Sequence, residues 1–316
     1  MKKQKILAVV GATASGKTAL GVELAKKFGG EVISVDSMQI YEGLDVTTAK
    51  PSVEEMQGIP HHLISIIPRS QRFSVADYVE LANQKIQEVA SRNKLPILVG
   101  GTGLYLDSVL NGMKFTPEEE TSVRKQLLKR AESEGNEKLY QELQRIDPQA
   151  AEKIHVNNTV RLVRALEVCQ TSGMTFTEYK KANLAQESPY DAIIIGLDYE
   201  NRQDLYDRIN RRVYKMLDAG MLDEVREAYQ QGNVGTSTAA IGYKELIPYL
   251  KQKASLEDCI AMIQQESRRY AKRQLTWFRR NAQIQWLILV KNDEVQEISE
   301  KAEKIIAKNE NLWYNR

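Results

Sequence analysis

The stretch GATASGKT at residues 11–18 constrains this chain more than any other part of it. It fits G-x-x-x-x-G-K-[ST], the phosphate-binding P-loop pattern, in which a glycine-rich turn joins a strand to a helix. An apolar run at residues 5–10 precedes it, and a helical pattern at residues 19–28 follows it. Such a turn directs backbone N–H groups and the positive helix end at one point.

We therefore expect a phosphate chain to bind to this turn. Lys17 adds a positive charge there, and the Thr18 hydroxyl is suited to hold Mg²⁺. The expected phosphate-binding residues are Gly11, Thr13, Ala14, Ser15, Gly16, Lys17 and Thr18. The motif indicates neither which molecule carries the phosphates nor what happens to it.

Strand and helix patterns alternate on both sides of this loop. Short apolar, β-branched runs occur at residues 31–35, 95–99, 192–197 and 286–290, and residues 75–92 and 202–219 show helical spacing. This alternation predicts an α/β fold with a doubly wound parallel sheet. Ligands of such sheets gather at the carboxyl ends of the strands. The P-loop, the loop that begins at Asp36 and the loop at residues 100–103 should therefore lie together.

The pattern changes after Gly112, where strand-like runs cease. Helical patterns rich in charged residues and glutamine follow at residues 118–133, 137–145, 148–153 and 159–171. We interpret residues 114–189 as an all-helical insertion into a catalytic core formed by residues 1–113 and 190–316. Near the end of the chain, Ser255 and Asp258 predict a capping box at the start of a long helix that ends at about residue 281.

Composition excludes several classes of protein. The net charge is only +2, from 44 basic and 42 acidic residues, so a polyanion partner would require a local basic surface. The two cysteines lie 90 residues apart, which excludes a C-x-x-C metal site. We see no signal peptide and no apolar run long enough to span a membrane. We expect a cytoplasmic enzyme without a membrane association or an evident protein partner.

The two other loops at the expected sheet edge carry polar groups. A carboxylate at Asp36 can bind magnesium, cap a helix or act as a base, and Ser37 and Gln39 can hydrogen-bond a nucleic-acid base or sugar. The strand at residues 95–99 runs into Gly100-Gly101-Thr102-Gly103 without the acidic residue that P-loop hydrolases use. We interpret these glycines as room for a bulky partner rather than as a plain tight turn.

The long helix near the C-terminus carries six cations in thirteen residues: Arg268, Arg269, Lys272, Arg273, Arg279 and Arg280. A solvated helix face is the alternative, but the near absence of acidic residues between them favours contact with a polyanion. Arg161 and Arg164 lie one turn apart in the insertion. His61 and His62 have no acidic residue or cysteine near them in sequence, so we expect structural hydrogen bonds rather than metal binding.

The motifs taken together resemble the tRNA dimethylallyltransferases, in order and over nearly the whole chain. The matching segments are GATASGKT at 11–18, DSMQIY at 36–41, TTAKP at 47–51, PHHL at 60–63, GGTGLY at 100–105, RLVRALE at 161–167, IGYKE at 241–245, YAKRQ at 270–274 and TWFR at 276–279. Ala12 is a departure, because many members have proline there. The zinc finger of eukaryotic relatives is missing, so we expect a bacterial-type member.

The resemblance implies transfer of a dimethylallyl group from dimethylallyl diphosphate to the N6 amine of the adenosine 3′ to the tRNA anticodon. It implies Asp36 as the general base, a P-loop that holds the donor's diphosphate with Mg²⁺, and Arg208 or Arg212 as a further diphosphate contact. The implied tRNA-binding residues are Asp36, Ser37, Met38, Gln39, Thr102, Thr159, Val160, Arg161, Leu162, Val163, Arg164, Arg268, Arg269 and Lys272.

Two alternatives differ in substrate or in reaction. Some relatives transfer the same group to free AMP, ADP or ATP, but the insertion and the basic helix argue against that acceptor. A P-loop nucleotide kinase or ATPase is a different class of enzyme, and the missing acidic residue after residues 95–99 argues against it.

Overall fold

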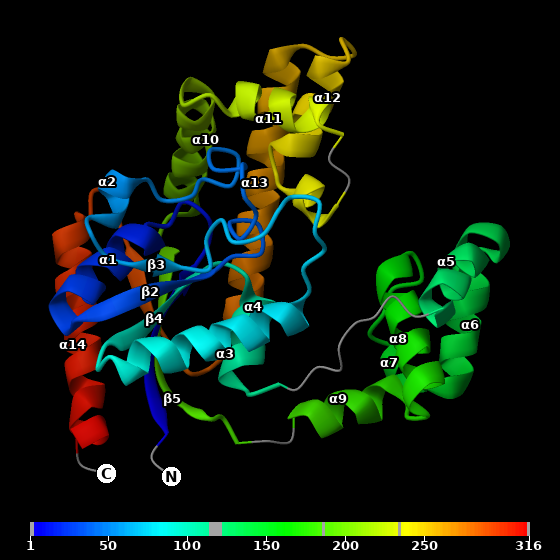
Figure 1. Cartoon of the computed structure of the whole chain (residues 1–316), viewed down its shortest axis with the longest axis horizontal. Helices are drawn as coiled ribbons and strands as arrows, with labels where there is room; N and C mark the ends of the chain where they lie inside the picture. Colours follow the sequence, from blue (N-terminus) through cyan, green and yellow to red (C-terminus); the bar gives the residue numbers. More distant parts are fainter. Residues whose placement is uncertain (1–2, 114–121, 185–186, 233–234, 315–316) are drawn as a thin grey trace. The chain divides into compact units, whose positions relative to one another are not determined.

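The computed structural model describes residues 3–113, 122–184, 187–232 and 235–314. The chain divides into two compact units (Figure 1). The first unit comprises Met1–Leu110 and Pro189–Arg316, and the second comprises Asn111–Ser188. The insertion expected from the sequence, residues 114–189, covers nearly the same segment as the second unit. Its first residues, 114–121, lie outside the described residues.

Six strands of the described residues form one sheet in the order β3-β2-β4-β1-β5-β6, and neighbouring strands run parallel. The strands are β1 (Gln4–Gly11), β2 (Gly30–Val35), β3 (His61–His62), β4 (Leu95–Gly100), β5 (Tyr190–Tyr199) and β6 (Ile284–Leu289). This P-loop NTPase-like α/β fold confirms the predicted fold class. The sequence did not predict β3, because two residues are too few to show a pattern.

Helices of the first unit cover the sheet or pack on the helices that cover it. They are α1 (Lys17–Phe28), α2 (Val53–Met56), α3 (Val75–Ser91), α4 (Gly103–Leu110), α10 (Arg202–Asp218), α11 (Met221–Gln230), α12 (Tyr243–Leu250), α13 (Leu256–Phe278) and α14 (Val295–Tyr314), with a 3₁₀ turn at Thr236–Ala239. α1 packs on β2 and β4 and lies beside α14 (Figure 1), and α3 also packs on β2 and β4. All six residues of β2 are buried, as expected for a strand covered on both faces.

The strand register brings the three predicted loops to one edge of the sheet. Gly100 of β4 is level with Val10 of β1 on one side and with Val35 of β2 on the other. The residues that follow these positions are therefore neighbours. This alignment places the P-loop, Asp36 and Gly101 side by side.

The second unit is helical throughout its described residues. Its helices are α5 (Ser122–Glu134), α6 (Asn136–Ile146), α7 (Pro148–Ala151), α8 (Thr159–Ser172) and α9 (Phe176–Leu184). Leu127, Leu139, Leu143 and Leu166 share its hydrophobic core. The start of the helix expected at 118–133 lies outside the described residues, and α9 had no counterpart among the expected helices.

The long predicted helix is α13, and Ser255 caps it by accepting a hydrogen bond from the Asp258 N–H at 3.1 Å. Within the described residues, no helix combines the length and the apolar character that crossing a bilayer requires. The histidine pair makes structural hydrogen bonds: His62 Nε2 lies 2.7 Å from Glu31 Oε2, and His61 Nδ1 lies 2.8 Å from the Ile59 carbonyl oxygen.

The glycines after β4 give room to α13. A Cβ on Gly101 would lie 2.1 Å from Gln274 Nε2, and a Cβ on Gly103 would lie 2.2 Å from Trp277 Cδ1. The Trp277 indole N–H in turn donates to Asp107 at 2.7 Å. The close approach inferred from the sequence is therefore made by the chain's own helix, which corrects the interpretation of these glycines as room for a partner.

Gly100 is the position where an added side chain should be tolerated least. A Cβ there would lie 2.1 Å from the Val35 carbonyl oxygen of the neighbouring strand, which cannot move without breaking the β2–β4 pairing. We expect Gly100→Ala to lower the free energy of unfolding by about 3 kcal/mol, measured by urea denaturation. Gly58→Ala is the control, because Gly58 has open space and a φ of +78°, so it should lose only about 1 kcal/mol. Equal losses would contradict the packing argument.

Candidate active site

The P-loop turn depends on backbone conformations that favour glycine. Gly16, the residue before α1, has a φ of +95°, and Ala14 also lies in the left-handed region with a φ of +62°. The Ser15 side chain is only 1% exposed, and its hydroxyl finds no hydrogen-bond partner among the described residues. A buried, unpaired hydroxyl in this turn indicates a polar ligand, because buried polar groups are almost always paired.

Lys17 is half-buried at the start of α1, and its Nζ donates to the Ala12 carbonyl oxygen at 2.5 Å. Burial, together with the nearby Arg212 guanidinium, lowers the pKa of Lys17 to about 7, and the charge of Asp36 opposes this effect. The charged form of the Lys17 amine is therefore poorly stabilised by the protein alone, and a bound anion would stabilise it.

Asp36 follows β2 directly, and the turn after it holds its carboxylate. The Oδ1 atom accepts hydrogen bonds from the backbone N–H groups of Met38 at 2.8 Å and Gln39 at 3.3 Å. Burial raises the pKa of Asp36 above its usual value, and these two hydrogen bonds, Lys17 and Arg212 oppose the rise. The result is a half-buried carboxylate whose pKa is raised, as general bases often require.

Two arginines, one turn apart on α10, reach the P-loop. Arg208 Nε donates to the Ala14 carbonyl oxygen at 3.0 Å, and its guanidinium lies over the Tyr199 ring. Arg212 donates from Nη1 to Thr13 Oγ1 at 3.1 Å and from Nη2 to the Ala49 carbonyl oxygen at 3.3 Å. The sequence favoured Arg208 and left Arg212 open; the structure brings both to the loop.

The remaining predicted residues of the core surround Asp36. Thr102 Oγ1 accepts a hydrogen bond from the Ser37 N–H at 3.1 Å, so the loop after β4 is tied to the loop after β2. The Gln39 side chain is bonded within the protein, since it accepts from Ser34 Oγ at 3.0 Å and donates to the Ala49 carbonyl oxygen at 3.2 Å.

A cavity of about 260 Å³ opens beside these groups. Asp36, Thr13 and Arg212 provide a polar part of its wall, while α10 and α13 provide aliphatic side chains. Its lining comprises Thr13, Asp36, Ser37, Met38, Thr47, Thr48, Ala49, Ile209, Arg212, Val213, Met216, Ala239, Ala240, Ile241, Lys244, Ile263, Glu266, Ser267, Tyr270 and Arg273. A charged wall joined to an apolar wall suits a molecule with a phosphate head and a short hydrocarbon chain.

Sequence reasoning missed several residues of this site on α13. Gln274 accepts from the Thr13 N–H at 2.8 Å and donates to the Gly101 carbonyl oxygen at 3.0 Å, so it connects two of the loops. Tyr270 lines the cavity, and burial raises its pKa to about 12. Both lie in the YAKRQ segment at residues 270–274, which was a signal for the site, although nothing in the sequence indicated their contacts.

The basic residues of α13 differ in their surroundings. Arg269 and Lys272 are exposed, and Arg269 Nη1 pairs with Glu266 at 2.6 Å. Arg268 is partly buried and donates to Asn210 Oδ1 at 2.6 Å. Arg269 and Lys272 are therefore exposed cations on α13, next to the face of this helix that lines the cavity and includes Arg273.

In the insertion, the predicted tRNA-binding segment lies on α8. Val160 is 68% exposed and Arg161 is also exposed, whereas Leu162 and Val163 are buried in the core of the unit. Thr159 hydrogen-bonds with Asn136, and Arg164 pairs with Glu167 at 3.0 Å. The side chains that can meet a partner are therefore those at the start of α8.

Comparison with known proteins identifies the family. The model of the IPP transferase family matches residues 39–281. A tRNA dimethylallyltransferase of Oceanobacillus iheyensis is 48% identical over 306 residues, which cover 96% of each chain. The chain belongs to the tRNA dimethylallyltransferase family. Another member, from Bacillus subtilis, is 48% identical over 287 residues and 90% of each chain.

Solved structures of this family share the fold. The full-length tRNA isopentenylpyrophosphate transferase of Bacillus halodurans aligns with a TM-score of 0.73 and 42% identity, over 99% of this chain and 100% of that one. A eukaryotic dimethylallyltransferase, described as acting on tRNA, aligns with a TM-score of 0.83 and 31% identity, over 99% of this chain and 80% of that one. Family membership makes the enzyme a prenyl transferase.

A metal ion would find few protein ligands here. The described residues contain no group of three or more His, Cys, Asp or Glu side chains that could hold one. The P-loop pattern offers one hydroxyl to a metal ion, which in this chain is that of Thr18 at the start of α1. This donor set fits Mg²⁺, which commonly takes one or two protein ligands and completes its shell with phosphate oxygens and water.

The pKa of Lys17 has a measurable consequence for donor binding. With a pKa of about 7, the amine is mostly neutral at pH 8, so a bound diphosphate should draw a proton onto it, roughly 0.9 per donor. Calorimetric titration at pH 8 in buffers of different ionisation enthalpy measures this uptake. Lys17→Arg should abolish it, since a guanidinium stays protonated. If the unaltered protein binds the donor at pH 8 without taking up a proton, Lys17 is not a neutral amine that becomes protonated on diphosphate binding.

Proposed function

We infer that this chain transfers a dimethylallyl group from dimethylallyl diphosphate to the N6 amine of the adenosine 3′ to the anticodon of tRNA, and that it releases diphosphate. The observation that carries this inference is the shared cavity, in which the Asp36 carboxylate and the Arg212 guanidinium face the same space as an aliphatic wall. Since tRNA in bacteria is cytoplasmic, we place the reaction in the cytoplasm.

The P-loop is the proposed site of the donor's diphosphate. Backbone N–H groups of residues 16–18 at the start of α1, the buried Ser15 hydroxyl, Lys17 and the two arginines of α10 supply donors and positive charge around one point. Thr18 would hold Mg²⁺, which when bound neutralises part of the diphosphate's charge. These groups favour departure of diphosphate, because they stabilise the negative charge that grows on it.

Asp36 is the proposed general base. The adenine amine is a weak nucleophile, because its lone pair is delocalised into the ring, and its N–H bonds become more acidic as the new C–N bond forms. The C–O bond to diphosphate breaks at the allylic carbon, the C–N bond forms, and the Asp36 carboxylate takes the proton released from nitrogen. The raised pKa of Asp36 suits this proton transfer.

The acceptor is expected to enter as an unstacked base of the anticodon loop, at a cost of a few kcal/mol. Ser37, Met38, Gln39 and Thr102 lie around Asp36 and are proposed to position it. Exposed cations on α13 and on α8 are proposed to bind the anticodon arm, which makes residues 114–189 a tRNA-binding insertion. The exposed cations are Arg269, Lys272 and Arg161, and the half-buried Arg268 and Arg164 lie on the same two helices.

The nucleotide kinase or ATPase remains less suitable on structural grounds. β4 ends at Gly100, and the space beyond it is taken by Gln274 from α13. No acidic side chain follows β4 there to hold a metal-bound water.

Replacing the base should affect turnover far more than binding. Asp36→Asn keeps an oxygen that can accept the N–H groups of Met38 and Gln39, but it cannot take a proton at neutral pH. We expect turnover to fall roughly 10²–10⁴-fold with tRNA affinity nearly unchanged. Single-turnover transfer and filter binding measure the two quantities. Asp218→Asn, at an exposed position on α10, is the matched control. A loss below threefold in Asp36→Asn would exclude Asp36 as the base.

The acceptor itself is tested by competition between substrates. We expect label from radioactive donor to enter an anticodon stem-loop and not AMP, and mass spectrometry of the digested RNA should find the dimethylallyl group on one adenosine. Transfer to AMP alone would favour the free-nucleotide alternative. ATP hydrolysis without donor-dependent modification would favour the kinase or ATPase class.

A further inference from the structure

Residues 44–50 form a loop that supplies part of the cavity wall. Thr47, Thr48 and Ala49 line the cavity. The Ala49 carbonyl oxygen accepts from Arg212 Nη2 at 3.3 Å and from Gln39 Nε2 at 3.2 Å. The position of this one carbonyl therefore influences where the Arg212 guanidinium lies relative to the P-loop.

Ala49 adopts a strained conformation. Its φ is +46°, in the left-handed region that residues with a Cβ rarely occupy. Such strain persists only where surrounding contacts hold the backbone, and it is common at functional sites. The contacts that hold this loop should therefore matter for the site.

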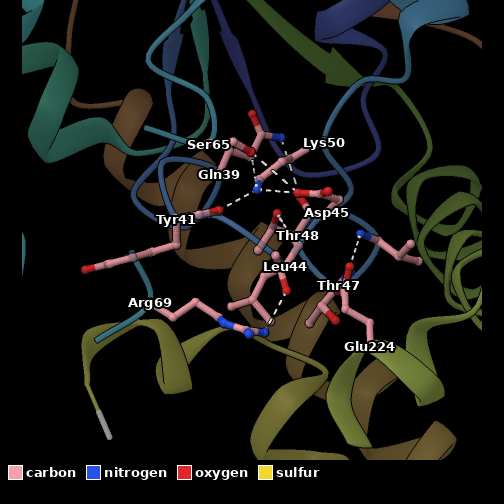
Figure 2. Close-up of polar contacts among 12 residues, drawn as sticks. Gln39, Tyr41, Leu44, Asp45, Thr47, Thr48, Lys50, Ser65, Arg69 and Glu224 are labelled. Atoms are coloured by element: carbon pink, nitrogen blue, oxygen red, sulfur yellow. Dashed lines mark hydrogen bonds and ion pairs between the residues drawn. The ribbon is translucent and has the colours of Figure 1, made fainter. Parts of the chain in front are cut away.

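Glu224, in the first turn of α11, bonds to the backbone of this loop. Its carboxylate accepts two successive backbone N–H groups, that of Val46 at 2.9 Å and that of Thr47 at 2.8 Å. Figure 2 shows Glu224 reaching Thr47 from a separate helix. Hydrogen bonds to a charged group are stronger than neutral ones. In the described part of the chain, Glu224 is not one of the residues that line the cavity.

Lys50 fixes the other end of the same loop. Its side chain is 5% exposed, and its Nζ bonds to Asp45 Oδ1 at 2.6 Å, to Ser65 Oγ at 2.7 Å and to the Tyr41 carbonyl oxygen (Figure 2). Lys50 and Glu224 thus hold the loop at two places, on either side of the segment that presents the Ala49 carbonyl.

We propose that Glu224 is a positioning residue for the transfer reaction. It holds the N–H groups of Val46 and Thr47, so that the Ala49 carbonyl keeps Arg212 directed at the donor's diphosphate. Glu224 touches neither substrate and acts through Arg212. The inference rests on the proposed role of Arg212 in donor binding.

Removing the carboxylate should leave the loop docked on the protein. Leu44 and Val46 pack in one apolar cluster with Met221 and Val225 of α11, and this packing does not need Glu224. An effect of Glu224 on catalysis can therefore be separated from an effect on folding.

The first test is Glu224→Gln, which replaces one acceptor oxygen with an NH₂ group that cannot accept a hydrogen bond. We expect kcat/KM for the donor to fall roughly tenfold, the loss of about one strong hydrogen bond, while tRNA affinity stays within twofold. Glu227→Gln is the matched control: Glu227 is exposed on the same helix and bonds to Gln231. An unchanged kcat/KM in Glu224→Gln would overturn the proposal. Should Glu224→Gln not fold, Glu224→Asp, which keeps the charge on a shorter side chain, takes its place.

The second test is a double-variant cycle with Arg212→Gln. If Glu224 acts through Arg212, the double variant should lose no more activity than Arg212→Gln alone. Losses that multiply would overturn the proposal, because a merely structural role of Glu224 predicts independence. An Arg212→Gln variant with unchanged donor kinetics would instead refute the role of Arg212 on which the inference rests.

Discussion

Two basic side chains, Lys17 and Arg212, and the Asp36 carboxylate lie close together in this protein, and the rest of the site is arranged around their mutual electrostatics. Lys17 and Arg212 repel each other, and Asp36 balances only part of their charge. An anion with two or more charges would relieve this imbalance, which is why we propose a diphosphate as the ligand of this space. The P-loop turn, the end of β2 and one face of α10 each supply a single member of this group. The parallel sheet is what brings the three elements to the same edge.

The same arrangement couples the two halves of the reaction. Lys17 and Arg212 oppose the rise that burial causes in the pKa of Asp36, so they favour its ionised form. A bound diphosphate adds negative charge beside Asp36 and should raise that pKa further, since like charges disfavour ionisation. The proposed base should therefore become stronger when the donor is present. In many P-loop enzymes the nucleophile attacks a phosphorus atom. In the reaction proposed here the same kind of loop would hold diphosphate as the leaving group, and the nucleophile would attack carbon.

Local patterns in the sequence predicted much of the fold and one half of the site. Strand and helix alternation is a short-range signal, so β1, β2, β4, β5 and β6 were expected, and register then placed Asp36 beside the P-loop. The other half joins residues far apart in the chain. Thr13 meets Gln274 across 261 residues, and Thr47 meets Glu224 across 177. Spacing carries no information about such contacts. For the same reason the glycines after β4 were misread, since Gln274 and Trp277 fill the room they leave.

The bond between Thr13 and Gln274 has a consequence for how the protein is made. A P-loop is often regarded as a local motif, complete once its strand and helix exist. Here the loop's N–H partner emerges from the ribosome 261 residues later, after roughly 10 to 50 s at ordinary bacterial rates of synthesis. β1 also waits for β5, its parallel neighbour near residue 195. The donor site is therefore among the last parts of the nascent chain to reach its final form, although it is encoded first.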